Sequence, residues 1–371
     1  MIYIRADANE NIGAGHIMRC LSIAAALHKK GAEVTFIGRD PQTAELLKKQ
    51  EFPVIMLSEA ADPLRPETEL PELGRLLQKA DGRNVITETT GSAEVLLVDS
   101  YQVTPAYLRE LNSILPVVYI DDQMSFAYPV ERLINYSFFA DARAYQKQYQ
   151  SAGVKLPELI LGPAFTPLRD EFRDVRRMIR SKVSSVLIST GASDSMNVLE
   201  LLLDRLLSGK TCFNQSNRTE GTPVEETVFY AVVGRLNPNK EHLFEKYRNH
   251  PGVRLLYDVS NLSDYMKSCD LSIAAAGVTA KELIACGCPG ILYSLADNQI
   301  LPARKLDELG LMEYAGDIRR DREEVLQRIE DFLKNMSGAA GESIRREQTA
   351  LMLGALDGRG SERIADRLLV R

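Results

Sequence analysis

Short apolar segments of the β type alternate with segments of helical periodicity along almost the whole chain. In the first half, this pattern predicts strands over residues 2–4, 33–37, 95–98 and 116–120. Residues 16–30 carry apolar side chains at helical spacing, and Gly31 follows them as a residue suited to end a helix. Aliphatic runs such as 95–98 suit parallel strands that are buried on both faces. The alternation therefore predicts a doubly wound α/β domain with a mostly parallel sheet.

A second α/β pattern begins after residues 161–168, a stretch that contains two prolines and a glycine. Beyond it, the pattern predicts further strands over residues 185–190, 227–233, 253–256, 271–275 and 290–293. Residues 208–226 are rich in polar residues and indicate a surface insertion. We therefore expect two domains, residues 1–165 and residues 166–371, the second ending in a charged helical tail.

The composition excludes several classes of function. The 371-residue chain has 45 Lys and Arg residues against 51 Asp and Glu residues, a formal charge of −6, so general binding to nucleic acid or to an anionic membrane is not expected. No apolar run approaches the roughly 18 residues of a membrane-spanning helix, and the N-terminus lacks the apolar segment of a signal peptide. The five widely spaced cysteines are interpreted as free thiols in a reducing compartment. These features predict a cytoplasmic protein that does not insert into membranes.

The turns from strand to helix are the places to search for a site, because ligands of open parallel sheets bind beyond the carboxyl ends of the strands. The first such turn contains Gly13-Ala14-Gly15-His16. Glycine lets the backbone approach a ligand, and the helix N-terminus presents unpaired N–H groups. The helix dipole there favours a neutral imidazole, which suits a general base. His16 is therefore a candidate catalytic base; the alternative is that it caps the helix or packs in the turn.

Acidic residues follow two of the other predicted strands. Asp99 comes directly after residues 95–98, and Asp121 and Asp122 come after residues 116–120. A carboxylate at such a position can orient His16 or bind a sugar hydroxyl, and the alternative is an Asp that caps the following helix or turn. Two adjacent Asp side chains on an extended segment point in opposite directions, and nothing in the spacing supplies a metal site.

Two later turns carry small residues and polar side chains. Residues 274–279 follow a predicted strand and open a helix, so backbone N–H groups near Gly277 can hold a diphosphate, with the hydroxyl of Thr279 as a further donor. Glu282 can accept two hydrogen bonds from a ribose diol. The alternative is a capping box formed by Thr279 and Glu282. Asn298 lies in the next turn, where it can donate its amide to a ligand or cap the following helix.

Together these residues resemble a known family. The motif Arg5-x-Asp7 followed by Gly13-x-Gly15-His16-x-x-Arg19-Cys20 resembles the N-terminal signature of the PseG/SpsG-like family, the UDP-2,4-diacetamido-2,4,6-trideoxy-β-L-altropyranose hydrolases of pseudaminic acid synthesis. The resemblance continues in order along nearly the whole chain, through Leu97-Val98-Asp99-Ser100-Tyr101, Asp121-Asp122, Gly162-Pro163, Leu168-Arg169-x-Glu171-Phe172, Gly191-Ala192-Ser193-Asp194, residues 270–282, Asp297-Asn298-Gln299 and Asp357-Gly358-x-Gly360. The family is similar in fold to the GT-B glycosyltransferases. The resemblance thus implies two Rossmann-like, doubly wound α/β domains that face each other across a cleft.

The resemblance also implies an activity and its residues. It implies a hydrolase that needs neither a metal nor a cofactor and that releases UDP and free sugar from a nucleotide-sugar in nonulosonic acid or surface polysaccharide synthesis. In that activity His16 activates water, Gly277 and Thr279 contact the phosphates, and Glu282 and Asn298 contact the nucleotide-sugar. From the N-terminal motifs, we also assign Asp7, Gly15, Asp99 and Tyr101 to substrate binding.

The chain departs from the family pattern at two turns. It has Ala192 where the family usually has a second glycine, and Ala276 and Val278 stand where the family has a glycine and a serine. Ala276 narrows the backbone approach and Val278 removes a hydroxyl, so a related nucleotide-sugar is a possible substrate. A GT-B glycosyltransferase and a non-catalytic nucleotide-sugar binding protein are the other two hypotheses. The acidic charge and the absence of a basic amphipathic helix favour the hydrolase over the glycosyltransferase.

Overall fold

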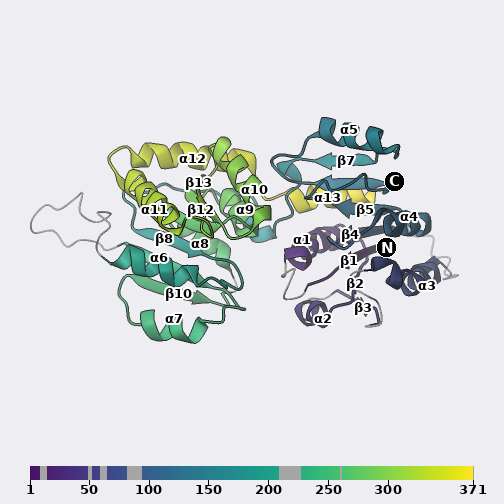
Figure 1. Cartoon of the computed structure of the whole chain (residues 1–371), viewed down its shortest axis with the longest axis horizontal. Coiled ribbons are helices and arrows are strands. Elements are labelled where there is room, and N and C mark those ends of the chain that lie inside the picture. The colour runs from purple at the N-terminus through teal and green to yellow at the C-terminus, as the bar shows by residue number, and fades with distance from the viewer. Residues whose placement is uncertain are drawn as a thin grey trace, which may run out of the picture. The chain divides into compact units, whose positions relative to one another are not determined.

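The chain forms two compact units, each built on one parallel sheet (Figure 1). The computed structural model describes residues 1–8, 15–48, 52–58, 65–81, 94–208, 227–259 and 261–370. Unit 1 consists of Met1–Arg169 with Arg359–Arg371, and unit 2 of Asp170–Gly358. Most of the loop predicted before His16 and of the insertion predicted over residues 208–226 lies outside the described residues.

Unit 1 has a seven-stranded sheet in the order β3-β2-β1-β4-β5-β6-β7, in which all neighbours are parallel. Its strands are β1 (Ile2–Ala6), β2 (Val34–Gly38), β3 (Val54–Met56), β4 (Val95–Asp99), β5 (Val117–Ile120), β6 (Arg132–Asn135) and β7 (Glu158–Leu161). Its helices are α1 (Gly15–Lys29), α2 (Pro41–Leu47), α3 (Leu70–Asp81), α4 (Pro105–Ile114), α5 (Ala142–Ala152) and α13 (Gly360–Leu369), with short 3₁₀ turns η1 (Pro66–Glu69) and η2 (Pro163–Phe165).

Unit 2 has a six-stranded sheet in the order β10-β9-β8-β11-β12-β13, again parallel throughout. Its strands are β8 (Ser185–Ser189), β9 (Val228–Val233), β10 (Val253–Tyr257), β11 (Leu271–Ala275), β12 (Gly290–Ser294) and β13 (Glu313–Asp317). Its helices are α6 (Val198–Leu207), α7 (Lys240–Tyr247), α8 (Leu262–Ser268), α9 (Val278–Ala285), α10 (Asp297–Glu308), α11 (Arg322–Ser337) and α12 (Gly341–Ala355), with the 3₁₀ turn η3 (Asp170–Phe172).

The fold class predicted from the sequence is confirmed, and each predicted strand is present. Four strands were missed: β3, β6, β7 and β13. They are short, and β3, β7 and β13 are edge strands that bury only part of their surface. An edge strand has a sheet neighbour on one side only, so it lacks the continuous apolar run that marks a central strand.

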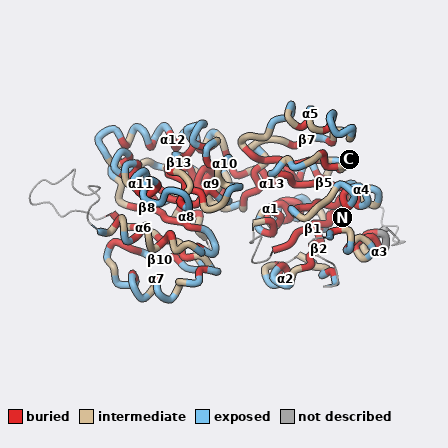
Figure 2. The backbone as a smooth tube through the Cα atoms, viewed as in Figure 1, coloured by how far each residue is buried: buried red, intermediate tan, exposed pale blue. Residues whose placement is uncertain are grey.

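Central strands are buried on both faces because helices cover both sides of each parallel sheet (Figure 2). In β1, Ile2, Ile4 and Ala6 belong to the cluster that includes α1, whereas Tyr3 belongs to the cluster on the other face. This alternation follows from the two-residue period of a strand. It leaves Arg5 as a buried charged side chain inside the sheet of unit 1.

Helix α13 corrects one expectation about the domains. We expected the whole C-terminal tail to belong with the second domain, but α13 is part of unit 1 and packs on α1. Ile364, Ala365 and Leu368 lie on one face of α13 and join the core around α1. Burying this apolar face stabilises the packing of α13 on α1. The helical periodicity of the tail predicts an apolar face but does not predict the unit against which that face packs.

Two glycines explain the motif Asp357-Gly358-x-Gly360. A Cβ on Gly360 would lie 2.0 Å from the carbonyl oxygen of Thr166, and a Cβ on Gly358 would lie 2.2 Å from that of Phe172. Gly358 also has a φ of +73°, which side chains other than glycine rarely adopt. The returning segment therefore runs against residues 166–172, where the chain first leaves unit 1, and only glycine permits this close approach.

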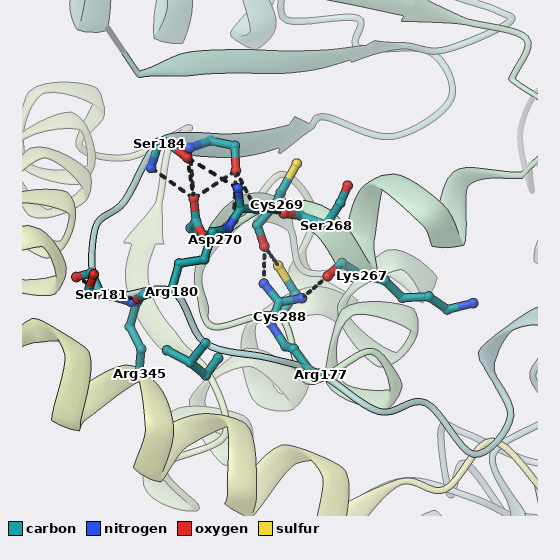
Figure 3. Close-up of polar contacts among 12 residues, drawn as sticks. Arg177, Arg180, Ser181, Ser184, Lys267, Ser268, Cys269, Asp270, Cys288 and Arg345 are labelled. Atoms are coloured by element: carbon teal, nitrogen blue, oxygen red, sulfur yellow. Dashed lines mark hydrogen bonds and ion pairs between the residues drawn. The ribbon is translucent and has the colours of Figure 1, made fainter. Parts of the chain in front are cut away.

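In unit 2, arginines hold the segment that leads into β8 (Figure 3). Arg177 donates to the carbonyl oxygens of Met266 and Lys267 at 2.7 and 3.2 Å, near the C-terminal end of α8. Arg180 pairs with Asp270 at 2.9 Å, and the buried Arg345 donates to the carbonyl oxygens of Arg180 and Ser181. Cationic groups are favoured at the C-terminal ends of helices, as Arg177 is at α8. Together, the contacts of the three arginines hold the segment that leads into β8.

Truncation of Ile364 should therefore weaken unit 1. We expect Ile364→Ala to lower its free energy of unfolding by about 3 kcal/mol, because the side chain is fully buried and truncation leaves a cavity. Hydrogen exchange should become faster in β1 and α1 and remain unchanged in β8 and β11. The control is Asp366→Ala, which removes only a surface ion pair with Lys30. Faster exchange confined to unit 2 would contradict the assignment of α13.

Candidate active site

The candidate active site of unit 1 lies where β1 and β4 end. These strands are neighbours, and their register pairs Ala6 with Asp99, the last residue of β4. Helix α1 begins at Gly15, after the turn that follows β1, and carries His16 in its first turn. Residues 83 positions apart in the sequence are thereby brought into contact. This arrangement follows from the parallel sheet, in which the carboxyl ends of all strands share one edge.

His16 and Asp99 form a buried pair. The Nδ1 atom of His16 lies 2.6 Å from Oδ1 of Asp99, and the two residues are 3% and 1% exposed. A carboxylate only accepts hydrogen bonds, so Nδ1 carries the proton and donates it to Asp99. The neutral ring then has its lone pair on Nε2, and Nε2 has no hydrogen-bond partner among the described residues. This is the tautomer that a general base requires.

Arg19 binds the same carboxylate from the other side. Its Nε donates to Oδ2 of Asp99 at 2.6 Å, and its Nη2 donates to Oδ1 in a short contact. Burial by itself would raise the pKa of Asp99, but the charge of Arg19 and the hydrogen bonds from Arg19 and His16 outweigh it and hold that pKa well below the ordinary value. Asp99 is therefore a carboxylate anion at neutral pH, although it is buried.

Tyrosines and a second carboxylate complete the surroundings of Arg19. Its Nη1 donates to the hydroxyl of Tyr136 at 2.6 Å and to Asp122 at 3.1 Å. Tyr101 donates to the same oxygen of Asp122 at 2.9 Å, and its ring meets the His16 ring edge-on at a centroid distance of 4.6 Å. Burial, opposed by Arg19, raises the pKa of Tyr136 to about 12, so this hydroxyl remains protonated at neutral pH.

Of the residues that the sequence assigned to substrate binding, Asp99 and Tyr101 contact His16. Gly15 begins α1, and a Cβ there would meet no atom of the described residues within 4 Å. Asp7 has a different environment: Arg5 pairs with one oxygen at 2.5 Å, and the backbone N–H groups of Arg39 and Asp40 donate to the other. Gly13 lies outside the described residues.

Asp121 and Asp122 lie on opposite sides of their strand, as expected for adjacent residues. Asp121 is buried, accepts from the hydroxyls of Tyr128 and Tyr145, and also accepts from the backbone N–H groups of Gln123 and Met124. It holds the turn after β5. Asp122 instead reaches Arg19 and Tyr101 and keeps a quarter of its side chain exposed. The capping alternative thus describes Asp121, whereas Asp122 borders the site.

Unit 2 places two candidate turns side by side. β11 and β12 are parallel neighbours, so the turns that lead into α9 and α10 follow adjacent strand ends. The N-cap residue of α9 is Gly277, which offers no side chain as a cap, so Thr279 and Glu282 do not form the capping box. The N-cap residue of α10 is Ala296, so Asn298 does not cap that helix. Both helix N-termini thus lack a side-chain cap, which leaves N–H groups for a ligand.

The departures from the family pattern also have visible positions. Val278 is the first residue of α9 and is 47% exposed. Ala276 is buried beside it. Asn298 is exposed and Thr279 is half-buried. The hydroxyl that the family carries at position 278 is therefore replaced by an exposed apolar group.

Arg19 and Tyr136 contribute to the site although neither was a candidate from the sequence. Arg19 was part of a recognised motif, and its distance of three residues from His16 places both on one face of α1, which is the available signal. Tyr136 follows β6, a strand that the sequence did not predict. Its contribution depends on the order of the strands in the sheet, which a residue pattern does not contain.

The described residues contain no group of three or more His, Cys, Asp and Glu side chains that could hold a metal ion. No helix within the described part of the chain is both long and apolar enough to cross a bilayer. Cys20, Cys269, Cys286 and Cys288 are buried free thiols, and burial raises the pKa of each of them.

The charge of Asp99 should be needed for stability as well as for orientation. In Asp99→Asn, the nearly buried Arg19 loses the closer of its two carboxylate partners and keeps only Asp122, so we expect the free energy of unfolding to fall by about 3 kcal/mol at pH 7. Since the folded-state pKa of Asp99 is lowered, its contribution is present above about pH 4 and is lost as the pH falls below that value. Urea unfolding should show a difference between wild type and variant that is constant from pH 5 to 8 and shrinks at lower pH. A difference that grows toward acid pH would contradict this.

Curated relatives match the chain at low identity. No family model matches it. It is 19% identical over 313 residues to the spore coat polysaccharide biosynthesis protein SpsG of Bacillus subtilis, covering 83% of this chain and 81% of that protein. It is 22% identical over 285 residues to the UDP-2,4-diacetamido-2,4,6-trideoxy-beta-L-altropyranose hydrolase of Campylobacter jejuni, covering 76% and 87%.

A longer relative combines two activities in its name. The chain is 22% identical over 346 residues to the pseudaminic acid cytidylyltransferase and UDP-2,4-diacetamido-2,4,6-trideoxy-beta-L-altropyranose hydrolase of Helicobacter pylori, covering 90% of this chain and 53% of that protein. The chain spans about half the length of two of the curated relatives that it matches.

Solved structures with the same architecture are GT-B glycosyltransferases. MurG of Acinetobacter baumannii matches with a TM-score of 0.64 at 14% identity, covering 99% of this chain and 98% of that chain. The calicheamicin glycosyltransferase CalG4 matches with a TM-score of 0.56 at 13% identity, covering 99% and 97%. At these identities the likeness shows the fold alone. The chain thus resembles the PseG/SpsG-like family in its sequence and the GT-B enzymes in its fold.

Proposed function

We propose that the protein is a hydrolase that cleaves a UDP-linked 2,4-diacetamido-2,4,6-trideoxy sugar, or a related UDP-sugar, to UDP and free sugar. The observation that carries the proposal is the His16–Asp99 pair, which fixes the proton on Nδ1 and leaves the Nε2 lone pair without a partner among the described residues. Such a base suits the activation of water. The sequence resemblance to proteins named as hydrolases supports the same reaction.

In the proposed reaction, Nε2 of His16 takes a proton from water as the water oxygen forms a bond to the anomeric carbon. The bond between that carbon and the phosphate oxygen breaks, and its electron pair stays on the oxygen of UDP. The products are the free sugar and UDP, and the imidazolium of His16 then returns its proton to solvent. Asp99 orients the ring and balances its transient positive charge, which is the usual task of a buried carboxylate beside a catalytic histidine.

The proposed task of unit 2 is to bind the nucleotide. The turns before α9 and α10 present N–H groups at uncapped helix N-termini, which bind phosphate oxygens well. Gly277 has no side chain to obstruct a ligand, and the space beside it holds no atom of the described residues within 4 Å of an added Cβ. We assign Gly277 and Thr279 to the diphosphate and Glu282 and Asn298 to the rest of the nucleotide-sugar. Stabilising the charge of departing UDP in this way requires no metal ion.

A glycosyltransferase is the second candidate, because the matched solved structures include a protein named as one. It would use the same base to activate an acceptor hydroxyl instead of water. The two candidates differ in one measurable respect, since a transferase needs an acceptor and a hydrolase does not. A binding protein without catalysis would release UDP under neither condition.

The hydrolase should release UDP from its substrate in the absence of any acceptor. We expect wild-type protein incubated with UDP-2,4-diacetamido-2,4,6-trideoxy-β-L-altropyranose, and in parallel with a panel of other UDP-sugars, to yield UDP and free sugar at an undiminished rate in excess EDTA. Proton NMR follows the anomeric signal, and a coupled assay follows UDP. UDP release that appears only with an added acceptor would point to the transferase. Loss of release in EDTA would refute metal independence.

Replacement of His16 should separate catalysis from binding. We expect His16→Ala to slow UDP release by at least about 100-fold, because the general base is removed. Calorimetric titration should show UDP binding close to wild type, since the nucleotide is assigned to unit 2. The matched control is His242→Ala, which removes an exposed histidine paired with Glu200 in unit 2. Equal losses in both variants would rule out a specific role for His16.

A further inference from the structure

Arg19 occupies the side of the Asp99 carboxylate that His16 leaves open. Oδ1 of Asp99 accepts from His16 and from Nη2 of Arg19, and Oδ2 accepts from Nε of Arg19 at 2.6 Å and from the Cys20 thiol at 3.4 Å. Nη2 of Arg19 also lies 3.0 Å from Nδ1 of His16. Because both of these nitrogens are donors, they converge on the shared oxygen and do not bond to each other. One carboxylate therefore lies between an imidazole and a guanidinium.

This arrangement bears on the protonation of His16. A buried carboxylate paired with imidazole alone attracts a second proton to the ring, since opposite charges stabilise each other. A protonated ring cannot act as a base. A guanidinium remains charged at every pH that the protein meets, and here it compensates the charge of Asp99 through two hydrogen bonds. Its charge next to Nδ1 also repels an imidazolium.

We propose that Arg19 is a positioning residue that compensates the charge of Asp99, so that Asp99 orients the His16 ring without holding the ring in its protonated form. The consequence for catalysis rests on the proposed function of His16 as a base. The effect of Arg19 on the protonation of the His16 ring does not rest on that proposed function, because it follows from the contacts among Arg19, Asp99 and His16.

The surroundings hold Arg19 in this place. Its side chain is only 10% exposed, and Tyr136 and Asp122 bind its Nη1. Asp122 also accepts from Tyr101, whose ring contacts His16, so the contacts close into a ring of interactions. Among the described residues, the charged or titratable groups in this closed set of contacts around His16 come from α1 and from the ends of β4, β5 and β6. They are Arg19, Cys20, Asp99, Tyr101, Asp122 and Tyr136. Without Arg19, this set would hold two carboxylates, of which Asp99 is paired with the imidazole, and no cation.

The test is a titration of the His16 ring by NMR in the full chain without ligand. The chain has four histidines, and the spectrum of His16→Ala identifies the signal. In Arg19→Gln, whose amide can still donate to Asp99, we expect the pH of half-protonation to rise by about one unit or more. Arg19→Met, which is neutral and apolar, should shift it in the same direction. The matched control Arg19→Lys keeps the charge, and its midpoint should stay near that of wild type.

The same variants predict a change in the rate profile. In Arg19→Gln and Arg19→Met, the fall in the rate of UDP release toward acid pH should begin at a higher pH than in wild type. The rate of these variants relative to wild type should therefore be about tenfold lower on the acid side of the profile than on the alkaline side. A purely structural role of Arg19 would lower the rate by one factor at all pH values.

Several outcomes would overturn the inference. The first is a pH of half-protonation of His16 that is unchanged or lower in Arg19→Gln and Arg19→Met when these variants are folded. The second is a rise of equal size in Arg19→Lys, because that variant retains the positive charge. A rise in the neutral variants together with no UDP release by wild type would support the role of Arg19 and refute the hydrolase. Thermal unfolding of each variant shows which of them are folded.

Discussion

The parallel sheet is the constraint on which both candidate sites depend. Parallel strands need crossover connections, so every strand of a unit ends at the same edge and every turn into a helix lies there. In unit 1 the neighbouring ends of β1 and β4 bring His16 to Asp99, and the ends of β5 and β6 add Asp122 and Tyr136. In unit 2 the neighbouring ends of β11 and β12 place the starts of α9 and α10 side by side.

Two buried arginine–carboxylate clusters at this edge of unit 1 show how a site differs from a structural contact. Arg5 pairs with Asp7 and with both oxygens of Glu69, and the other oxygen of Asp7 accepts from backbone N–H groups. That cluster is satisfied internally and joins β1 to the segment after β2. The Arg19–Asp99 cluster is equally well paired, but it includes an imidazole whose second nitrogen has no described partner. Burying paired charges costs solvation in both cases, and only the second arrangement presents a reactive atom.

The fold does not decide between hydrolysis and transfer. The GT-B architecture is shared with proteins named as glycosyltransferases, and one fold can host many reactions. The two candidate functions differ in the group that the base activates. A hydrolase activates water, and a glycosyltransferase activates the hydroxyl of an acceptor. The exposed Val278 at the start of α9 puts an apolar side chain where the family that the sequence resembles has a hydroxyl.

The sequence alone determined the α/β class of both units, nine of the thirteen strands and the turns that carry the candidate residues, and it missed β3, β6, β7 and β13 among the described residues. It could do so because burial on both faces imposes aliphatic runs such as 95–98, and because small residues such as Gly277 mark a turn from strand to helix. Tertiary structure decided which residues meet. The strand order joins Arg19 to Asp99, Asp122 and Tyr136, separates Asp121 from Asp122 in role, and engages Asp7 in a structural pair. It also returns α13 to unit 1. These pairings are contacts between residues far apart in the chain. A local pattern of residues therefore does not predict them.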